Sequence, residues 1–192
     1  MTFRILYPFL AVFLMASCQN EDAQRLAAAK DAKKKELIFA NVEKGWNFSN
    51  PPIGQKSLEI IKNWEELRLF AAALNQKPKS SIGAFQKKAK ELSKKAAVLN
   101  NNIPQKFNKP EIKARISVLI TKVNSINLFI NLQQIPDDKI ALLVDDINTE
   151  MASLYRQMDE IVRKSDIPKE EGEADMIRML DTARAIPNTP KP

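Results

Sequence analysis

The chain has no histidine, a single cysteine and only four glycines among its 192 residues. Histidine is the commonest general base and the commonest transition-metal ligand, so its absence excludes a Ser-His-Asp triad, a Cys-His pair and His-ligated haem. The di-iron site of four-helix bundles is excluded for the same reason, because it needs a Glu-x-x-His motif on two of its helices. We therefore predict no cofactor and no metal ion.

Carboxylate pairs remain as the only source of enzymatic chemistry. The pairs are adjacent in sequence: Glu65 and Glu66, Asp137 and Asp138, Asp145 and Asp146, and Glu170 and Glu171. On a helix, adjacent side chains point about 100° apart and do not converge on one substrate. We predict that the protein is not an enzyme and name no catalytic residue. A hydrolase that draws two carboxylates from different helices stays open as an alternative.

Long hydrophobic runs are also scarce, and the clearest one stands at the N-terminus. It covers residues 5–16, follows the positive charge of Arg4, and is interrupted only by Tyr7 and Pro8. A run of this length is too short to cross a bilayer, which needs about 20 helical residues, but is typical of an export signal. Small residues then precede Cys18, so the sequence predicts a removable signal peptide over residues 1–17.

The segment "LMASC", residues 14–18, resembles the lipobox of bacterial lipoprotein precursors, with Met15 where leucine is usual. The resemblance covers about the first 22 residues. It implies that Cys18 becomes the mature N-terminus and carries a thioether-linked diacylglycerol and an N-acyl chain such as palmitate. Each buried methylene contributes about 0.8 kcal/mol, so more than one chain anchors the protein stably to the cell envelope. Gln19, in place of aspartate, favours the outer membrane; the periplasmic and the surface face both stay open.

The remaining sequence predicts an all-α fold. Four glycines and eleven prolines argue against a many-turned β protein. Apolar residues recur at steps of three and four, which is the spacing of amphipathic helices. We predict helices over residues 21–44 and 55–76, after Ser81, after Pro110 and after "IPDD". Short connections favour an antiparallel up-and-down bundle of four or five helices, with a short C-terminal helix over residues 173–185. The predicted domains are an acylated N-terminus and acidic tether (18–22), a bundle (23–185) and a disordered proline-rich tail (186–192).

Lysine clusters are the first candidate binding feature of a chain with a formal net charge of +7. Such patches attract anionic lipids or glycans, whereas a solvated helix face is the alternative. No aromatic residues are interleaved for base stacking, so we predict no nucleic-acid partner. The candidate residues are Lys30, Lys33, Lys34, Lys35, Lys87, Lys88, Lys94 and Lys95.

A second candidate lies in "SINLFINLQQI", residues 125–135, where Leu128, Phe129 and Leu132 fall outside the main apolar face. A helix that is apolar almost all round is either central or presents an apolar strip to a partner, a lipid or a ligand. Trp46, Phe48 and Trp64 are expected to pin a loop to the bundle rather than to line a glycan or peptide site.

These features together predict a lipid-anchored helical protein of the cell envelope that acts as a non-catalytic interaction or structural module. Two alternatives remain. A carrier of a hydrophobic or anionic small molecule predicts a pocket near Leu128, Phe129 and Leu132. An envelope hydrolase predicts two carboxylates that converge in a cleft.

Overall fold

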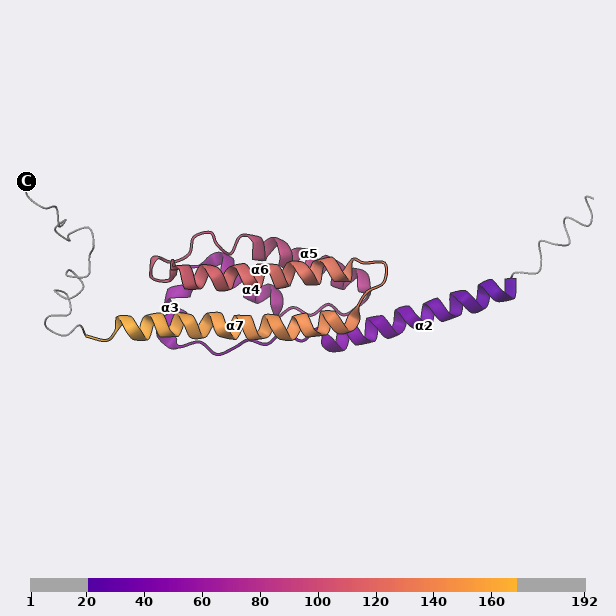
Figure 1. Cartoon of the computed structure of the whole chain (residues 1–192), viewed down its shortest axis with the longest axis horizontal. Coiled ribbons are helices and arrows are strands. Elements are labelled where there is room, and N and C mark those ends of the chain that lie inside the picture. The colour runs from indigo at the N-terminus through magenta and orange to yellow at the C-terminus, as the bar shows by residue number, and fades with distance from the viewer. Residues whose placement is uncertain (1–20, 169–192) are drawn as a thin grey trace, which may run out of the picture.

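A computed structural model describes residues 21–168, and these residues form helices and connecting loops without a β-strand (Figure 1). The predicted signal peptide, Cys18, the helix over 173–185 and the tail over 186–192 lie outside the described residues. The prediction of an all-α bundle is confirmed. None of the described helices is long and apolar enough to cross a membrane.

The centre of the bundle is an antiparallel helix pair, α6 (Pro110–Ile130) and α7 (Asp137–Ser165). Lys122 bonds to Asp146 at 2.7 Å, and nearer the start of α6 the guanidinium of Arg115 donates to the hydroxyl of Ser153. The sum of the two residue numbers is 268 in both pairs, as a constant antiparallel register requires. Helix α6 begins with proline at its first position, where the missing N–H would have no helical partner.

Helix α5 (Ile82–Ala97) also packs antiparallel to α6. Ser93 bonds to Asn124 at 2.6 Å, and the Gln86 amide donates to the carbonyl of Ile130 at 3.0 Å. Ser81 caps α5 by accepting from the backbone N–H of Ala84. The helix predicted after Pro110 is confirmed, and the apolar residues that recur there at steps of three and four form its buried face: Ile112, Ile116, Leu119, Val123, Ile126 and Ile130.

Helix α2 (Glu21–Gly45) runs parallel to α7, so the two helices enter the bundle at the same end (Figure 1). The Asn41 amide donates to Asp137 at 2.6 Å, and one turn later Gly45 lies against Ala141. A Cβ atom on Gly45 would stand 2.8 Å from the Cβ of Ala141. The close approach of the two helices therefore depends on glycine at this position.

The connection over residues 46–54, here called the strap, follows α7 toward its C-terminal end. Asn148 of α7 holds it at two points, accepting from the Ser49 N–H at 2.8 Å and donating to the Asn47 carbonyl at 3.0 Å. Further along α7, both carboxylate oxygens of Asp159 accept from the Gly54 N–H at 3.0 Å. These bonds satisfy strap backbone groups that have no partner in a helix.

The single helix predicted over 55–76 is wrong, because two helices occupy it: α3 (Gln55–Ile61) and α4 (Glu65–Leu74). Ile61, Trp64, Leu67 and Phe70 are all buried, and they stand three residues apart. In a straight α-helix each such step rotates the side chain by about 60°, so the four cannot face one core. The break before Trp64 solves this conflict, and its indole N–H donates to the carbonyl of Asn101 at 3.1 Å.

Candidate functional site

Most of α2 extends beyond the bundle, as Figure 1 shows. We call residues Asp22–Leu37 the stalk; every one of them is exposed, and burial begins only at Ile38. The reason is the register of α2 on α7: Asn41 lies opposite Asp137, the first residue of α7, so residues of α2 more than one turn before Asn41 have no part of α7 beside them. The sequence predicted residues 23–185 as one bundle domain, and this projection was not foreseen.

The stalk is helical through its composition. From Glu21 to Leu37 it contains no glycine, no proline and no β-branched residue, and alanine, lysine, glutamate and leucine dominate. A helix rises about 1.5 Å per residue, so the stalk is about 24 Å long.

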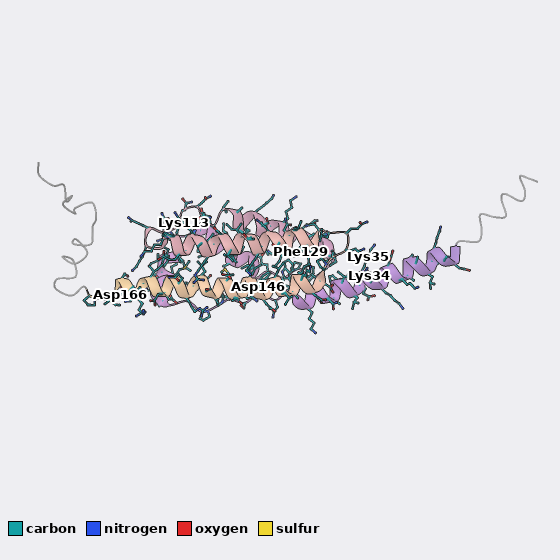
Figure 2. The ribbon with its side chains drawn as sticks, viewed as in Figure 1. Lys34, Lys35, Lys113, Phe129, Asp146 and Asp166 are labelled. Atoms are coloured by element: carbon teal, nitrogen blue, oxygen red, sulfur yellow. The ribbon has the colours of Figure 1, made fainter. Side chains whose placement is uncertain are left out.

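The stalk carries the first predicted lysine cluster: Lys30, Lys33, Lys34 and Lys35 are exposed (Lys34 and Lys35 are labelled in Figure 2). None of the four makes an ion pair or hydrogen bond with the described part of the chain. Leu26 and Leu37, which are 60% and 61% exposed, share one stripe with Lys30 and Lys33 at steps of four, three and four. This stripe points away from the side of α2 that carries Ile38 and Val42, which face the bundle.

The second predicted cluster is on α5, and its four lysines differ in environment. Lys87 and Lys94 are exposed, and Lys95 stands 3.9 Å from Glu91. Lys88, by contrast, is 7% exposed, and its ammonium donates to Gln76 at 3.0 Å and to Glu91 at 3.1 Å. Lys88 therefore does not belong to an exposed binding surface, because its charge is satisfied within the bundle.

The predicted apolar strip is on the surface near the end of the bundle from which the stalk projects. Leu128 is 60% and Leu132 is 43% exposed, and Phe129 is half-buried with the ammonium of Lys139 5.9 Å from its ring centre (Figure 2). None of the three lines the three hollows described below.

The described surface has open hollows, and three of them concern the predicted site residues. One of about 360 Å³ lies between α5 and the loop that precedes it, beside Lys88, and one of about 430 Å³ lies between α3 and the end of α7. The third, of about 440 Å³, lies where α2 meets α7 and contains Asp137, Asp138 and Asp145 beside Lys44. Asp137 already accepts from Asn41, and the first two aspartates stand in the first turn of α7, where the helix dipole favours acidic residues. Within residues 21–168 no group of carboxylates is arranged to hold a metal ion.

The tryptophans are core residues. Trp46 is 1% exposed and packs edge-on against Phe48 at 5.6 Å and Phe85 at 5.1 Å, and Trp64 is fully buried. Trp46 packs the start of the strap against the bundle, and Trp64 does the same for the residues between α3 and α4. Both side chains therefore have the structural role that the sequence predicted.

Surface ion pairs lie near the C-terminal end of α7, and one of them joins α3 to the residue that follows α7. Lys56 of α3 bonds to Asp166 at 2.6 Å, and this hydrogen bond lowers the pKa of the Asp166 carboxyl. A lowered pKa means that the contact is formed above the ordinary carboxyl pKa and is lost as the pH falls through the lowered value. In the same way the hydrogen bond from Arg163 lowers the pKa of Glu160, while burial raises the pKa of the Tyr155 hydroxyl.

One surface was missed by the sequence reasoning, although its signal is present. We call it the outer seam: Ala114, Val118, Thr121, Ser125, Leu128 and Leu132. From Ala114 to Leu128 its steps of four and three repeat the spacing of the buried face of α6 on the opposite side of the same helix, and Leu132 lies two residues after the helix ends at Ile130. Val118, Thr121, Leu128 and Leu132 are exposed, and Ser125 is half-buried. The sequence predicted only Leu128 and Leu132 of this seam, because the smaller residues before them are less apolar.

No protein-family model, no curated protein and no solved structure matches the chain. Its function is therefore inferred from the residues and their geometry.

Proposed function

We propose that this protein is a lipid-anchored component of the bacterial cell envelope that acts without catalysis, as an interaction or structural module carried on a helical stalk. The observation that carries the proposal is the exposed stalk, which begins shortly after Cys18, the residue of the lipobox resemblance. An anchored protein needs a segment between its lipid and its folded body, and a helix about 24 Å long provides one.

The exposure of the stalk on all sides supports this role. Helices in globular proteins gain most of their stability by packing an apolar face, whereas Asp22–Leu37 packs no side chain against the bundle. A helix that is polar nearly all round and contributes nothing to the core is suited to bridging two bodies through solvent. Here the two bodies are the membrane and the bundle.

The stalk also suits a negatively charged membrane surface. Each lysine near such a surface contributes about 1 kcal/mol of attraction. Lys30 and Lys33, with Leu26 and Leu37, lie on the stripe that faces away from the bundle. The outer membrane, favoured by Gln19, is our proposed location.

Labelling with radioactive palmitate, combined with membrane fractionation, tests the anchor. We expect the wild-type chain to take up the label and sediment with membranes, and Cys18→Ser to lose both properties. Asn20→Ser is the matched control, since it changes a neighbouring residue and leaves the thiol. Unlabelled wild-type chain, or a Cys18→Ser chain that still sediments with membranes, would contradict the anchor.

Protease treatment of intact cells then decides between the two faces. Digestion of the bundle from outside would place it on the cell surface and direct the search to host or glycan partners. Protection, with digestion only after the outer membrane is opened, would place it in the periplasm.

A further inference from the structure

Positive charge is concentrated in and just before α5. Residues 77–97 contain seven lysines and one glutamate, which gives this segment a net charge of +6. The whole chain has a net charge of +7, so the other residues taken together are close to neutral. A segment with charge of nearly one sign attracts an anionic partner from solution.

The exposed face of α5 is formed mainly by lysine side chains. Five residues of this helix are exposed: Gly83, Lys87, Lys90, Lys94 and Ala97. We call the three lysines the lysine row, because their spacing of three and four residues places them on one side of the helix. A helix rises about 1.5 Å per residue, so they follow one another roughly 5 Å apart along the axis.

The ammonium groups of the lysine row make no ion pair with the described residues of the chain. Glu91 is the only carboxylate on α5, and it lies 3.1 Å from Lys88 and 3.9 Å from Lys95. Elsewhere on the surface, by contrast, Lys62 pairs with Glu59 at 2.6 Å. The lysine row therefore keeps its charge available for a partner outside the chain.

The hollow of about 360 Å³ between α5 and the preceding loop lies at the first lysine of the row. Lys77 and Lys87 line it together with Lys88 and Glu91, which are already bonded to each other. Its volume is within the range of small-molecule sites, about 300–1,000 Å³. One anionic group can therefore enter the hollow, while the row continues along α5 toward Lys94.

The residues of this face do not suit a lipid or a protein partner. Helices that lie in a lipid interface bury a large apolar face, whereas no exposed residue of α5 is apolar and larger than alanine. The stalk differs, since Leu26 and Leu37 are exposed on it. Protein interfaces are depleted in lysine and rely on aromatic residues and arginine. Helix α5 contains no arginine, and its one aromatic residue, Phe85, is buried.

We propose that the lysine row and the hollow beside it bind an anionic polysaccharide, a linear chain whose sugar units carry carboxylate or phosphate groups. Such a chain is hydrated and repeats its charge at about the length of a sugar unit, so successive anions can reach successive lysines. Lysine suits this partner because its ammonium is a compact charge on a flexible stem and does not require the planar geometry of a bidentate contact.

This inference names a partner for the interaction module proposed above and rests on that role, but it does not require the lipid anchor. Binding is measured with the full chain in a mild detergent, whether or not Cys18 carries lipid. A chain that is anchored but does not bind the polysaccharide would overturn this inference and leave the anchor intact.

Fluorescence anisotropy of a labelled galacturonate decamer, titrated with the full chain, tests the site. Lys90→Gln/Lys94→Gln should raise the dissociation constant at least about tenfold, because it removes two of the three charges of the row. The matched control is Lys109→Gln/Lys113→Gln, which removes two exposed lysines four residues apart at the start of α6. At about 0.1 M salt, charges more than about 10 Å apart are largely screened, so the control should weaken binding by less than about threefold. A wild type that does not bind, or equal weakening by both variants, would overturn the proposal.

The length of the probe distinguishes a polysaccharide surface from a pocket for a small anion. We expect the decamer to bind more tightly than the galacturonate monomer or inorganic phosphate, because only the decamer reaches from the hollow to Lys94. Equal affinity for the monomer or for phosphate would overturn the proposal, as would equal binding of neutral dextran.

Vesicles containing anionic phospholipid test the competing partner. We expect Lys90→Gln/Lys94→Gln to bind these vesicles as well as the wild type does, since the row has no apolar side chain to enter lipid. If this variant loses vesicle binding by the factor expected for the decamer, the row belongs to lipid headgroups and the proposal fails.

Discussion

The two parts of α2 are one uninterrupted helix in two different situations. Ile38, Phe39 and Val42 pack against the core cluster, whereas the stalk is exposed throughout. The helix does not change its backbone at this point; what changes is whether α7 lies beside it. The docked part is held by tertiary contacts, whereas the stalk depends on helix propensity and packs no face on the bundle, so substitutions in the docked part should destabilise the bundle and those in the stalk should leave its stability almost unchanged.

The largest expected effect is at Trp46, the first residue of the strap, directly after the docked part of α2. Trp46→Ala should lower the free energy of unfolding by about 3–5 kcal/mol, because it empties a buried site between Phe48 and Phe85. Urea denaturation followed by circular dichroism measures it. Leu26→Ala in the stalk is the control and should change the unfolding free energy by less than about 0.5 kcal/mol. A loss below about 1 kcal/mol for Trp46→Ala would show that the site refills or is not part of the cooperative core.

The next largest loss of stability is expected at the contact between the parallel helices α2 and α7. The new methyl group of Gly45→Ala would stand 2.8 Å from the Cβ of Ala141 and push α2 away from α7. This overpacking should destabilise the bundle by about 1–3 kcal/mol, measured by the same urea denaturation.

The double variant Gly45→Ala/Ala141→Gly makes room again and should recover part of the loss. Gly83 is the comparison within α5, since the nearest atom to a Cβ at this position is the Ser81 hydroxyl at 3.7 Å. Gly83→Ala should therefore stabilise the helix by about 0.5–1 kcal/mol. Equal effects at Gly45 and Gly83 would mean that the α2–α7 contact does not depend on the missing side chain.

A helix breaker separates the two parts most directly. Ala28→Pro removes a helical hydrogen bond in the middle of the stalk, at a local penalty of about 3 kcal/mol. Helical circular dichroism should fall, while the urea midpoint of the bundle should not move. Ala40→Pro, placed beside Phe39, should lower the midpoint as well. A midpoint shift with Ala28→Pro would show that the stalk packs on the bundle in solution.

The sequence was sufficient to predict burial where one local pattern of apolar residues determines which face of a helix is buried. The buried face of α6 has six aliphatic residues at regular steps, and all six are buried as predicted. The break before Trp64 was missed because residues 55–76 are good helix formers, and only the shared core shows that positions three apart must all be buried.

The stalk could not be predicted for a different reason. Residues 21–44 form a helix from their composition, but whether that helix packs depends on Asn41 meeting Asp137, far later in the chain. The outer seam is likewise visible in the sequence as spacing, while its exposure follows from α5 and α7 occupying the other faces of α6. A short stretch of sequence does not show how one helix is aligned with another that lies far away in the chain.

Substitution of the stalk lysines should have the smallest effect on the stability of the fold. It should have a clear effect on how the stalk lies against lipid. Lys30→Gln/Lys33→Gln should leave the unfolding free energy within about 0.5 kcal/mol of wild type, because both side chains are exposed and make no ion pair with the described residues. On vesicles containing anionic phospholipid, a nitroxide attached at Leu37→Cys should be more immersed in wild type than in the double variant, since each lysine contributes about 1 kcal/mol of attraction to the surface. Lys94→Gln on α5 is the control for loss of charge away from the stalk. Equal immersion in all three chains would show that the stalk stands away from the lipid and serves as a spacer alone.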